Sequence, residues 1–496
     1  AELELYSTLL EELLPTPAKS HYTFNLRDIA SVMQGVLSAN PKSTNEPADI
    51  IRLWVHENLR VFRDRLIAVE DREWFDKNLR DLVPKYFQGE LFAKADANGD
   101  GCLQWEEVVH CEMSHLIYGD FMDPNADPKL YTEITDTEKM VTVVEEYLDD
   151  YNATTTKKMP LVMFVDAVGH VARISRVIRQ PLGNALLLGV GGSGRQSLSR
   201  LAASMSEFDC FQIEITKTYG KVEWKDDLKK LLFKSGDEGK SVVFLFSDTQ
   251  IVKESFLEDI NNILNTGEVP NLLDDNDNGQ ILNSMRPIAQ AAGTPQTKVA
   301  LYNIFVSRVR ANLHLSICMS PLGEAFRTRL RNFPSLVNNC TIDFFAAWPE
   351  EALRSVAKNT LDTIDMGKDE IKEGIVQMCG RIHQSVEVAS GKYLEEQRRY
   401  NYVTPTSYLE VLSTFKTLLA IKREQVGTAK KRLVIGLDKL ASTEVEVDAL
   451  QKQIQEMQPV LIKTSAEVEE MMIVIAKDKV DAAATQETVE KEEAIA

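Results

Sequence analysis

The sequence predicts an α/β fold in which a parallel sheet with flanking helices is preceded by a helical domain and followed by one long helix. Three observations favour this fold. A glycine-rich loop joins an apolar run to a helical pattern within residues 184–202, a second apolar run ends at Asp248, and an apolar seam covers residues 447–475. The first two patterns are typical of a sheet that carries ligand-binding loops at one edge, and the third is typical of a coiled coil.

The composition excludes several classes of protein. The chain has 496 residues, of which 56 are basic and 75 acidic, and its formal net charge is −19. This charge argues against a nucleic-acid-binding protein and against a surface that docks on anionic lipid. The apolar runs are too short to span a bilayer, and the six cysteines form no C-x-x-C pair, as expected for free thiols in a reducing compartment. Both ends fall inside helical patterns, so we expect a segment of a longer protein.

The first 92 residues carry helical patterns. Apolar residues of segments 25–37 and 50–66 recur at helical spacing, which predicts a small helical domain. Arg27 stands at the start of one of these helices, where its side chain could reach a phosphate or lie in solvent.

Residues 96–107 match a twelve-residue EF-hand loop, which supplies oxygens at positions 1, 3, 5, 7, 9 and 12 and turns sharply at a glycine in position 6. The expected ligands are Asp96, Asn98, Asp100, the carbonyl of Cys102, Gln104 and Glu107, with Gly101 at the turn. Helical patterns over residues 86–92 and 108–116 flank the loop. The sequence therefore predicts a Ca²⁺ site. The alternative is a polar turn that binds no metal, because no convincing second loop follows.

The segment 184–198 has the strand–loop–helix pattern of a phosphate-binding P-loop. Its glycines let the backbone turn and direct N–H groups at a phosphate, beside the positive end of the next helix dipole. Arg195 stands where lysine is usual, and Gln196 stands where the Mg²⁺-binding Ser or Thr is usual. The predicted nucleotide-binding residues are Gly189, Val190, Gly191, Gly192, Ser193, Gly194, Arg195, Gln196 and Ser197. The alternative is a glycine-rich connector.

Residues 241–248 form a β-rich apolar run that ends in Asp248. This pattern is typical of a Walker B strand, whose aspartate holds Mg²⁺. Thr249 and Gln250 follow, where a hydrolysing ATPase carries a glutamate that polarises water, so we expect nucleotide binding with slow hydrolysis. A core strand that ends in Asp by chance is the alternative.

Further patterns complete the α/β region. Residues 161–178 predict a helix with His170, Arg173 and Arg176 on its polar side, and residues 208–215 predict a strand. A lone histidine in such a place is more often a surface or capping residue than a ligand. Residues 313–320 predict another strand, and Ser320 at its end is the candidate for a polar contact to the terminal phosphate. Arginines follow on a short helix or turn, where they either reach a neighbouring site or form a basic surface: Arg327, Arg329 and Arg331.

The C-terminal part predicts helices. Pro349 opens a helical segment that extends to about residue 400, and a second begins at Pro405. From Val447 to Ile475 the apolar steps alternate between three and four residues, with Thr464 as the polar member. This stripe needs a partner helix, either from a second chain or from a returning segment of the same chain.

The order of these features resembles the motor of a dynein heavy chain of the axonemal, inner-arm, single-headed type. The strings that carry the resemblance are Leu14–Asp28, Gly119–Pro124, Gly183–Ala202, Phe256–Pro270, Phe333–Val337 and the run from Tyr402 onward. The resemblance implies that residues 1–125 close the third AAA+ module. Residues 126–345 and 346–404 would be the large and small subdomains of the fourth module, and residues 405–496 the outgoing helix of the stalk.

The resemblance also implies roles and partners. Arg27 resembles a sensor arginine that faces the third module's nucleotide, and Arg329, or less favourably Arg331, resembles the catalytic finger that reaches the same site. The fourth module would bind ATP or ADP with Mg²⁺ in a regulatory role, and the EF-hand insert would bind Ca²⁺. Implied partners in a ciliary or flagellar axoneme are microtubules, the other AAA+ modules, light and intermediate chains, and actin or centrin-type subunits. The alternative is a nucleotide-dependent scaffold ATPase with a dimerising coiled coil.

Overall fold

The computed structural model describes residues 1–42, 44–89 and 102–494. Its N-terminal part contains helices and one small antiparallel pair: α1 (Glu2–Glu12), α2 (Leu26–Leu37), α3 (Pro47–Val61), α4 (Val69–Tyr86), α5 (Trp105–Val108), β1 (Ile117–Gly119) and β2 (Thr132–Ile134). Asn25 sets the start of α2, because its side chain accepts a hydrogen bond from the N–H of Arg27 at 2.7 Å. The helices share one buried core, which includes Leu59, Phe62 and Phe75, whereas Ile134 of β2 belongs to a core formed with the following region.

A five-stranded parallel sheet forms the centre of the following region. Its strands are β3 (Ala185–Gly189), β4 (Asp209–Phe211), β5 (Val242–Ser247), β6 (Leu313–Met319) and β7 (Thr341–Phe345), in the order β4-β5-β6-β3-β7. Every residue of β3, β5 and β6 is buried, as expected for parallel strands that are covered on both faces. The C-terminal ends of parallel strands meet at one edge, so the loops after β3, β5 and β6 are neighbours.

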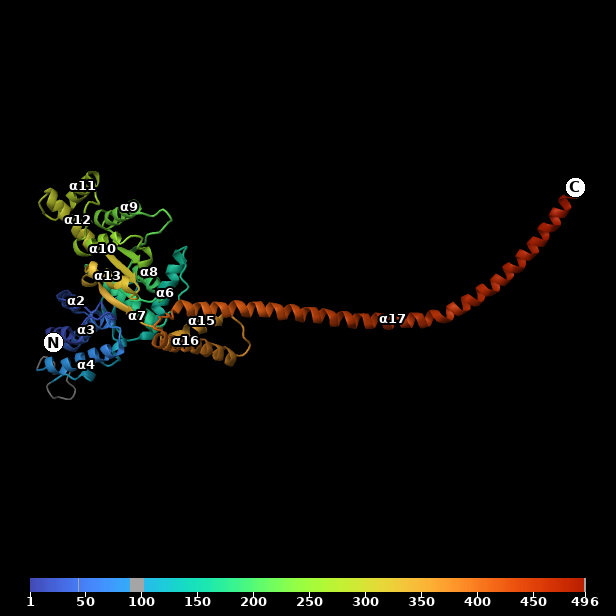
Figure 1. The fold of residues 1–496 in the computed structure, drawn as a ribbon, viewed down its shortest axis with the longest axis horizontal. Helices are drawn as coiled ribbons and strands as arrows, with labels where there is room; N and C mark the ends of the chain where they lie inside the picture. Colours follow the sequence, from blue (N-terminus) through green and yellow to red (C-terminus); the bar gives the residue numbers. More distant parts are fainter. Residues whose placement is uncertain (43, 90–101, 495–496) are drawn as a thin grey trace. The chain divides into compact units, whose positions relative to one another are not determined.

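Helices cover both faces of the sheet (Figure 1). One face packs against α6 (Thr137–Thr154), α7 (Val165–Arg179) and α8 (Arg195–Met205). The other packs against α9 (Lys221–Leu232), α10 (Ser255–Thr266), α11 (Asp275–Ala291), α12 (Lys298–Asn312), α13 (Glu324–Asn332) and α14 (Ser335–Asn338). Leu187 belongs to the first core and Leu186 to the second, because successive side chains of a strand point to opposite faces. The α/β fold that the sequence predicts is confirmed.

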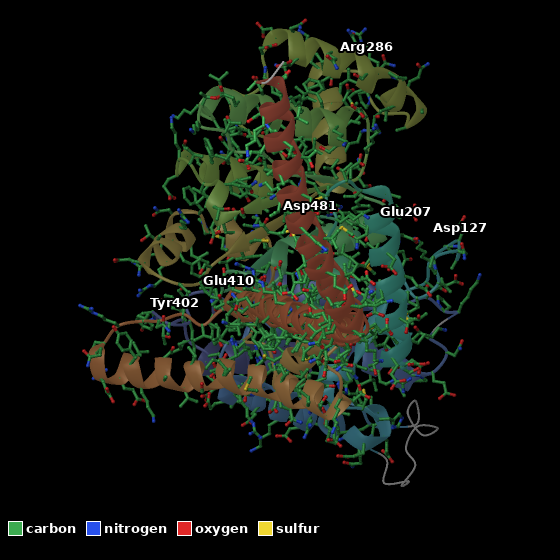
Figure 2. The ribbon with its side chains drawn as sticks, turned by 90° about the vertical axis from the view of Figure 1, so that its right-hand side faces the viewer. Asp127, Glu207, Arg286, Tyr402, Glu410 and Asp481 are labelled. Atoms are coloured by element: carbon green, nitrogen blue, oxygen red, sulfur yellow. The ribbon has the colours of Figure 1, made fainter. Side chains whose placement is uncertain are left out.

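Two helices, α15 (Glu350–Asp362) and α16 (Asp369–Gln397), support the start of α17 (Pro405–Glu493). The hydroxyl of Tyr408 donates to the carbonyl of Leu353 at 2.8 Å, and Tyr408 and Leu412 are buried. Figure 2 labels Tyr402 in the connection before α17 and Glu410 near its first turns. Residues 1–412 form one compact unit and residues 413–496 a second.

The second unit is the remainder of α17. The whole helix has 89 residues, which corresponds to about 130 Å at 1.5 Å per residue. Its predicted seam is exposed: Leu461 keeps 65% of its surface and Met471 61%. Within residues 413–494 no other element covers this apolar stripe.

Within the α/β region, two elements differ in extent from the sequence-based expectation. Helix α7 begins at Val165 rather than at Leu161, and β4 covers only Asp209–Phe211 of the predicted strand 208–215. Beyond Phe211 the chain leaves the sheet, because the carbonyl of Ile213 accepts a hydrogen bond from the side chain of Gln250 at 2.7 Å. Among the described residues, no helix is both long enough and apolar enough to cross a membrane.

Candidate functional site

The glycine-rich loop connects the buried end of β3 at Gly189 to the start of α8 at Arg195. Two of its glycines, Gly192 and Gly194, have φ angles of +80° and +88°, a region that other residues rarely adopt. The space that a side chain at Gly192 would need is filled by Thr406, at the start of α17. The loop therefore has the backbone of a phosphate cradle and is in direct contact with the base of the long helix.

Arg195 lies differently from what the P-loop pattern suggests. Its guanidinium turns inward and donates hydrogen bonds to the carbonyls of Met319 at the end of β6 and of Val190, the latter at 3.1 Å. Burial lowers the pKa of Arg195. Because its donors are directed at strand ends, Arg195 as positioned here ties β3 to β6, and a phosphate in the loop would be held chiefly by backbone N–H groups.

The neighbouring polar residues also have protein partners. The side chain of Gln196 accepts a hydrogen bond from Gln212 at 3.3 Å, and Gln212 in turn accepts one from Arg200. Ser197 is half-buried on the first turn of α8. Its hydroxyl is an oxygen ligand of the type that Mg²⁺ prefers.

Asp248 and Ser320 meet at the edge of the sheet. The carboxylate of Asp248, which follows β5, accepts a hydrogen bond from the backbone N–H of Ser320, which follows β6, at 3.0 Å. The hydroxyl of Thr249 lies 2.8 Å from that of Ser247. The geometry therefore joins the two predicted strand-end residues, and neither Thr249 nor Gln250 offers a carboxylate to polarise water.

A cavity of about 440 Å³ borders the loop. Ser193, Gly194 and Leu198 contribute one wall, and Thr360 of α15 and Leu409 of α17 contribute to another. Phe164 and Trp348, which pack edge-to-face with ring centroids 5.4 Å apart, make part of it aromatic. A flat apolar group linked to phosphates in the loop would find room here.

The three predicted arginines lie away from this cavity. Arg27 donates to the side chain of Asn339. Arg329 pairs with Glu254 at 2.7 Å on the surface of its own α/β region. Arg331 lines a separate open cavity of about 520 Å³, which Pro15 and Pro17 also border. Arg331, rather than the preferred Arg329, thus faces the N-terminal helical part, and the finger role of either residue stays a prediction.

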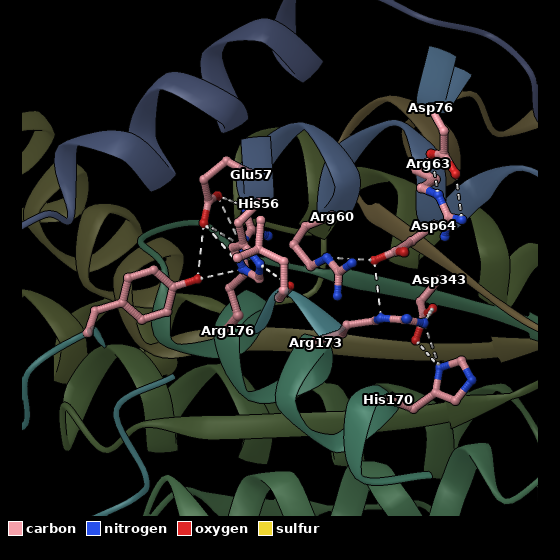
Figure 3. A network of polar contacts seen from close by, with 12 residues as sticks. His56, Glu57, Arg60, Arg63, Asp64, Asp76, His170, Arg173, Arg176 and Asp343 are labelled. Atoms are coloured by element: carbon pink, nitrogen blue, oxygen red, sulfur yellow. Dashed lines mark hydrogen bonds and ion pairs between the residues drawn. The ribbon is translucent and has the colours of Figure 1, made fainter. Parts of the chain in front are cut away.

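A buried network of ion pairs, which the sequence patterns did not predict, connects α3 to α7 and β7 (Figure 3). Arg176 donates through Nε to Glu57 at 3.0 Å, and both side chains are at most 2% exposed. The carboxylate of Asp64 lies 3.1 Å from Nε of Arg60 and 3.2 Å from Nε of Arg173. Arg173 and Arg176 thus find their partners in distant segments of the chain, which the helical pattern of residues 161–178 does not reveal.

The network ends at the wall of the cavity. Nη1 of Arg173 lies 3.1 Å from one oxygen of Asp343, and Nδ1 of His170 lies 2.6 Å from the other. Burial alone would raise the pKa of Asp343, but the charges of His170 and Arg173 and their hydrogen bonds outweigh it and hold the pKa at about 2. The ring of His170 stacks on Phe345 with centroids 3.8 Å apart. His170 is therefore neither a surface nor a capping residue, because it is largely buried and pairs with a carboxylate of β7.

The predicted Ca²⁺ ligands Asp96, Asn98 and Asp100 lie outside the described residues. Helix α4 ends at Tyr86, the exiting helix α5 has only four residues, and Gln88 pairs with Cys102 as an antiparallel bridge. The predicted helices over 86–92 and 108–116 are therefore wrong in the part that the structure describes. Glu107 accepts a hydrogen bond from the N–H of Gln104 at 2.8 Å, and no cluster of three His, Cys, Asp or Glu side chains suited to a metal occurs outside residues 43, 90–101 and 495–496.

Comparisons with known proteins agree with this geometry. Residues 159–418 match the family described as P-loop containing dynein motor region D4, and residues 1–89 match an AAA+ lid domain. Dynein axonemal heavy chain 1 of Homo sapiens is 48% identical over 493 residues, which cover 98% of this chain and 11% of that protein. Dynein axonemal heavy chain 6 of Homo sapiens is 44% identical over 499 residues, covering 100% and 12%.

A flagellar relative is the dynein-1-beta heavy chain, flagellar inner arm I1 complex, of Chlamydomonas reinhardtii. It is 44% identical over 457 residues, which cover 92% of this chain and 10% of that protein. The chain thus spans about a tenth of the length of the curated relatives it matches.

Proposed function

Because the chain belongs to the dynein motor family, as a P-loop containing dynein motor region, we propose that it binds ATP or ADP as a regulatory module of an ATP-driven motor. The observation that carries this proposal is the loop between β3 and α8, whose glycines leave backbone N–H groups for phosphate beside Asp248 and Ser320. Asp248 and the hydroxyl of Ser197 both offer oxygen atoms, the ligands that Mg²⁺ prefers. Such an ion neutralises phosphate charge.

Membership of the same family also suggests a role for this chain within the whole motor. We propose that residues 1–125 close the third AAA+ module, that residues 126–345 and 346–404 form the fourth, and that residues 405–496 begin a stalk toward a microtubule-binding tip. The exposed seam of α17 supports the presence of a partner helix, which in our proposal comes from the same chain. The names of the relatives favour an axoneme as location, with light and intermediate chains, actin or centrin-type subunits as candidate partners. The dimerising scaffold ATPase is not favoured.

Slow hydrolysis is the first expected property. Replacing Thr249 by glutamate supplies the missing base, a group that typically contributes about 10²–10⁴ in rate. We expect at least a tenfold rise in phosphate release at this site, measured on the full-length motor chain with its other nucleotide sites blocked. In Thr249→Gln the new side chain has the size of glutamate but no charge, so this variant should leave the rate of phosphate release unchanged. An equal rate for both variants would contradict the explanation.

Calcium binding is a second proposal, which rests on the match of residues 96–107 to an EF-hand loop. Glu107→Gln removes one of the two carboxylate oxygens expected at position 12, so calorimetric titration should show weaker Ca²⁺ binding. The exposed neighbour Glu106 provides the control, since Glu106→Gln should bind as the unmodified chain does. Absence of a Ca²⁺ heat at millimolar ion in the unmodified chain would contradict the proposal.

A further inference from the structure

The peptide group between Met319 and Ser320 connects the two halves of the proposed nucleotide site. Its carbonyl oxygen, on Met319, accepts a hydrogen bond from Nη1 of Arg195 at the start of α8. Its N–H, on Ser320, donates to Oδ2 of Asp248 at 3.0 Å. A peptide group is planar and rigid. A single plane therefore links the arginine of the glycine-rich loop to the carboxylate that follows β5.

Arg195 is held in this position by burial and by a second hydrogen bond. The residue is only 9% exposed, and its Nη2 donates to the carbonyl of Val190 at 3.1 Å. The planar guanidinium places its donors in a fixed fork, which a lysine ammonium does not offer. If Arg195 turned toward a phosphate, the carbonyls of Val190 and Met319 would lose this donor, which is costly for buried polar groups.

The charge of Arg195 also acts on Asp248. Burial lowers the pKa of Arg195, and the negative charge of Asp248 works in the opposite direction. A hydrogen bond to the carbonyl side of a peptide group polarises that group and strengthens its N–H as a donor. Asp248 is thus held through Oδ2. Its other oxygen, Oδ1, has no hydrogen-bond partner in the part of the chain that the structure describes, and a carboxylate oxygen is a ligand that Mg²⁺ prefers.

We propose that Arg195 is a positioning residue, which acts through the peptide group of Met319 and Ser320 to orient Asp248 for Mg²⁺ and does not contact phosphate. This inference rests on the proposed nucleotide site. It gives the arginine a role different from that of the lysine usual at this place in a P-loop, which reaches the phosphates. Without the guanidinium, the peptide group loses its polarisation, and the N–H of Ser320 holds the carboxylate less firmly. The phosphates keep the backbone N–H groups of the loop.

The dependence of ATP binding on Mg²⁺ distinguishes the two roles. ATP is titrated calorimetrically into the 496-residue chain with excess Mg²⁺ and again with EDTA, and the ratio of the two Kd values gives the gain from Mg²⁺. Arg195→Met keeps an unbranched stem but removes the charge and the donors. We expect this variant to lower the gain from Mg²⁺ about tenfold, the size of one lost hydrogen bond. Arg286→Met, a substitution at an exposed residue of α11 (Figure 2), should leave the gain unchanged.

A phosphate contact predicts the opposite sign. Mg²⁺ neutralises part of the phosphate charge. An arginine that bound phosphate would therefore matter at least as much in EDTA as in Mg²⁺, and its loss would leave the gain from Mg²⁺ the same or larger. Such a result in a folded Arg195→Met overturns the inference. An unmodified chain that binds ATP equally well with and without Mg²⁺ overturns it as well.

A second variant tests the same path from its other end if Arg195→Met does not fold. Proline has no N–H, so Ser320→Pro removes the donor to Asp248 and leaves Arg195 in the chain. We expect the same decrease of about tenfold in the gain from Mg²⁺. An unchanged gain in a folded Ser320→Pro overturns the inference while the nucleotide site stands. Failure of the folded, unmodified chain to bind ATP under either condition overturns both proposals.

Discussion

Replacing Glu57 by glutamine is expected to lower the free energy of unfolding of the 496-residue chain by about 3–5 kcal/mol. Glu57 is 0% exposed, and its carboxylate accepts hydrogen bonds from Nε of Arg176 at 3.0 Å and from the hydroxyl of Tyr131 at 3.0 Å. Burial alone would lower the pKa of Arg176, but Glu57 outweighs it and raises that pKa. The neutral amide would leave a buried guanidinium without its counterion. Denaturant unfolding followed by circular dichroism measures the loss.

A matched control shows whether the loss of stability comes from burial of the ion pair or from the loss of any ion pair. Glu214 pairs with Lys157 at 2.8 Å, but the two side chains are 80% and 84% exposed. Solvent screens such a pair, so Glu214→Gln should leave the unfolding transition where it is. If Glu57→Gln lowered the free energy of unfolding as little as this control does, the buried network would not hold α3 against α7.

Substitution of Gly192 by alanine is expected to reduce nucleotide affinity more than tenfold. A residue other than glycine in the left-handed region costs about 1–2 kcal/mol. The added Cβ would also overlap the hydroxyl of Thr406 and approach the backbone nitrogen of that residue to 2.9 Å. The loop must therefore change shape or the first turn of α17 must move. Titration of ATP into the variant measures the loss.

Gly191 provides the control for this substitution within the same loop. No atom lies within 4 Å of the Cβ that an alanine at Gly191 would add, and its φ is outside the left-handed region. Gly191→Ala should therefore unfold at the same temperature as the unmodified chain, whereas Gly192→Ala should unfold earlier. Equal melting temperatures for the two variants would show that the contact between Gly192 and Thr406 carries no strain.

The sequence predicts those parts of the site whose signals are local. The loop 189–197 is contiguous, so glycine spacing and flanking periodicity predict it, and Asp248 follows directly from the end of an apolar run. The direction of Arg195 could not be predicted, because its partner Met319 is 124 residues away. The buried pairing of Glu57 with Arg176 could not be predicted for the same reason, since 119 residues separate the two. Charged residues on the polar side of a helical pattern suggest a surface until the opposing charge is known.

Two of the sequence-based errors concern how far an element extends. The helical pattern over residues 108–116 gave way to the four residues of α5, and the strand predicted over 208–215 stops at Phe211. In the second case the side chain of Gln250 donates a hydrogen bond to the carbonyl of Ile213, beyond the end of β4. Tertiary contacts thus override local periodicity at the ends of elements, where few residues carry the signal.

Calorimetric titration of ATP with Mg²⁺ into the 496-residue chain tests most directly whether the loop between β3 and α8 is a nucleotide site. We expect one saturable site per chain. Gly192→Ala should weaken ATP binding more than tenfold, and Glu214→Gln should leave the binding enthalpy nearly unchanged. A chain that is folded by circular dichroism and yet gives no binding heat and no rise in melting temperature at millimolar ATP would contradict the proposed function.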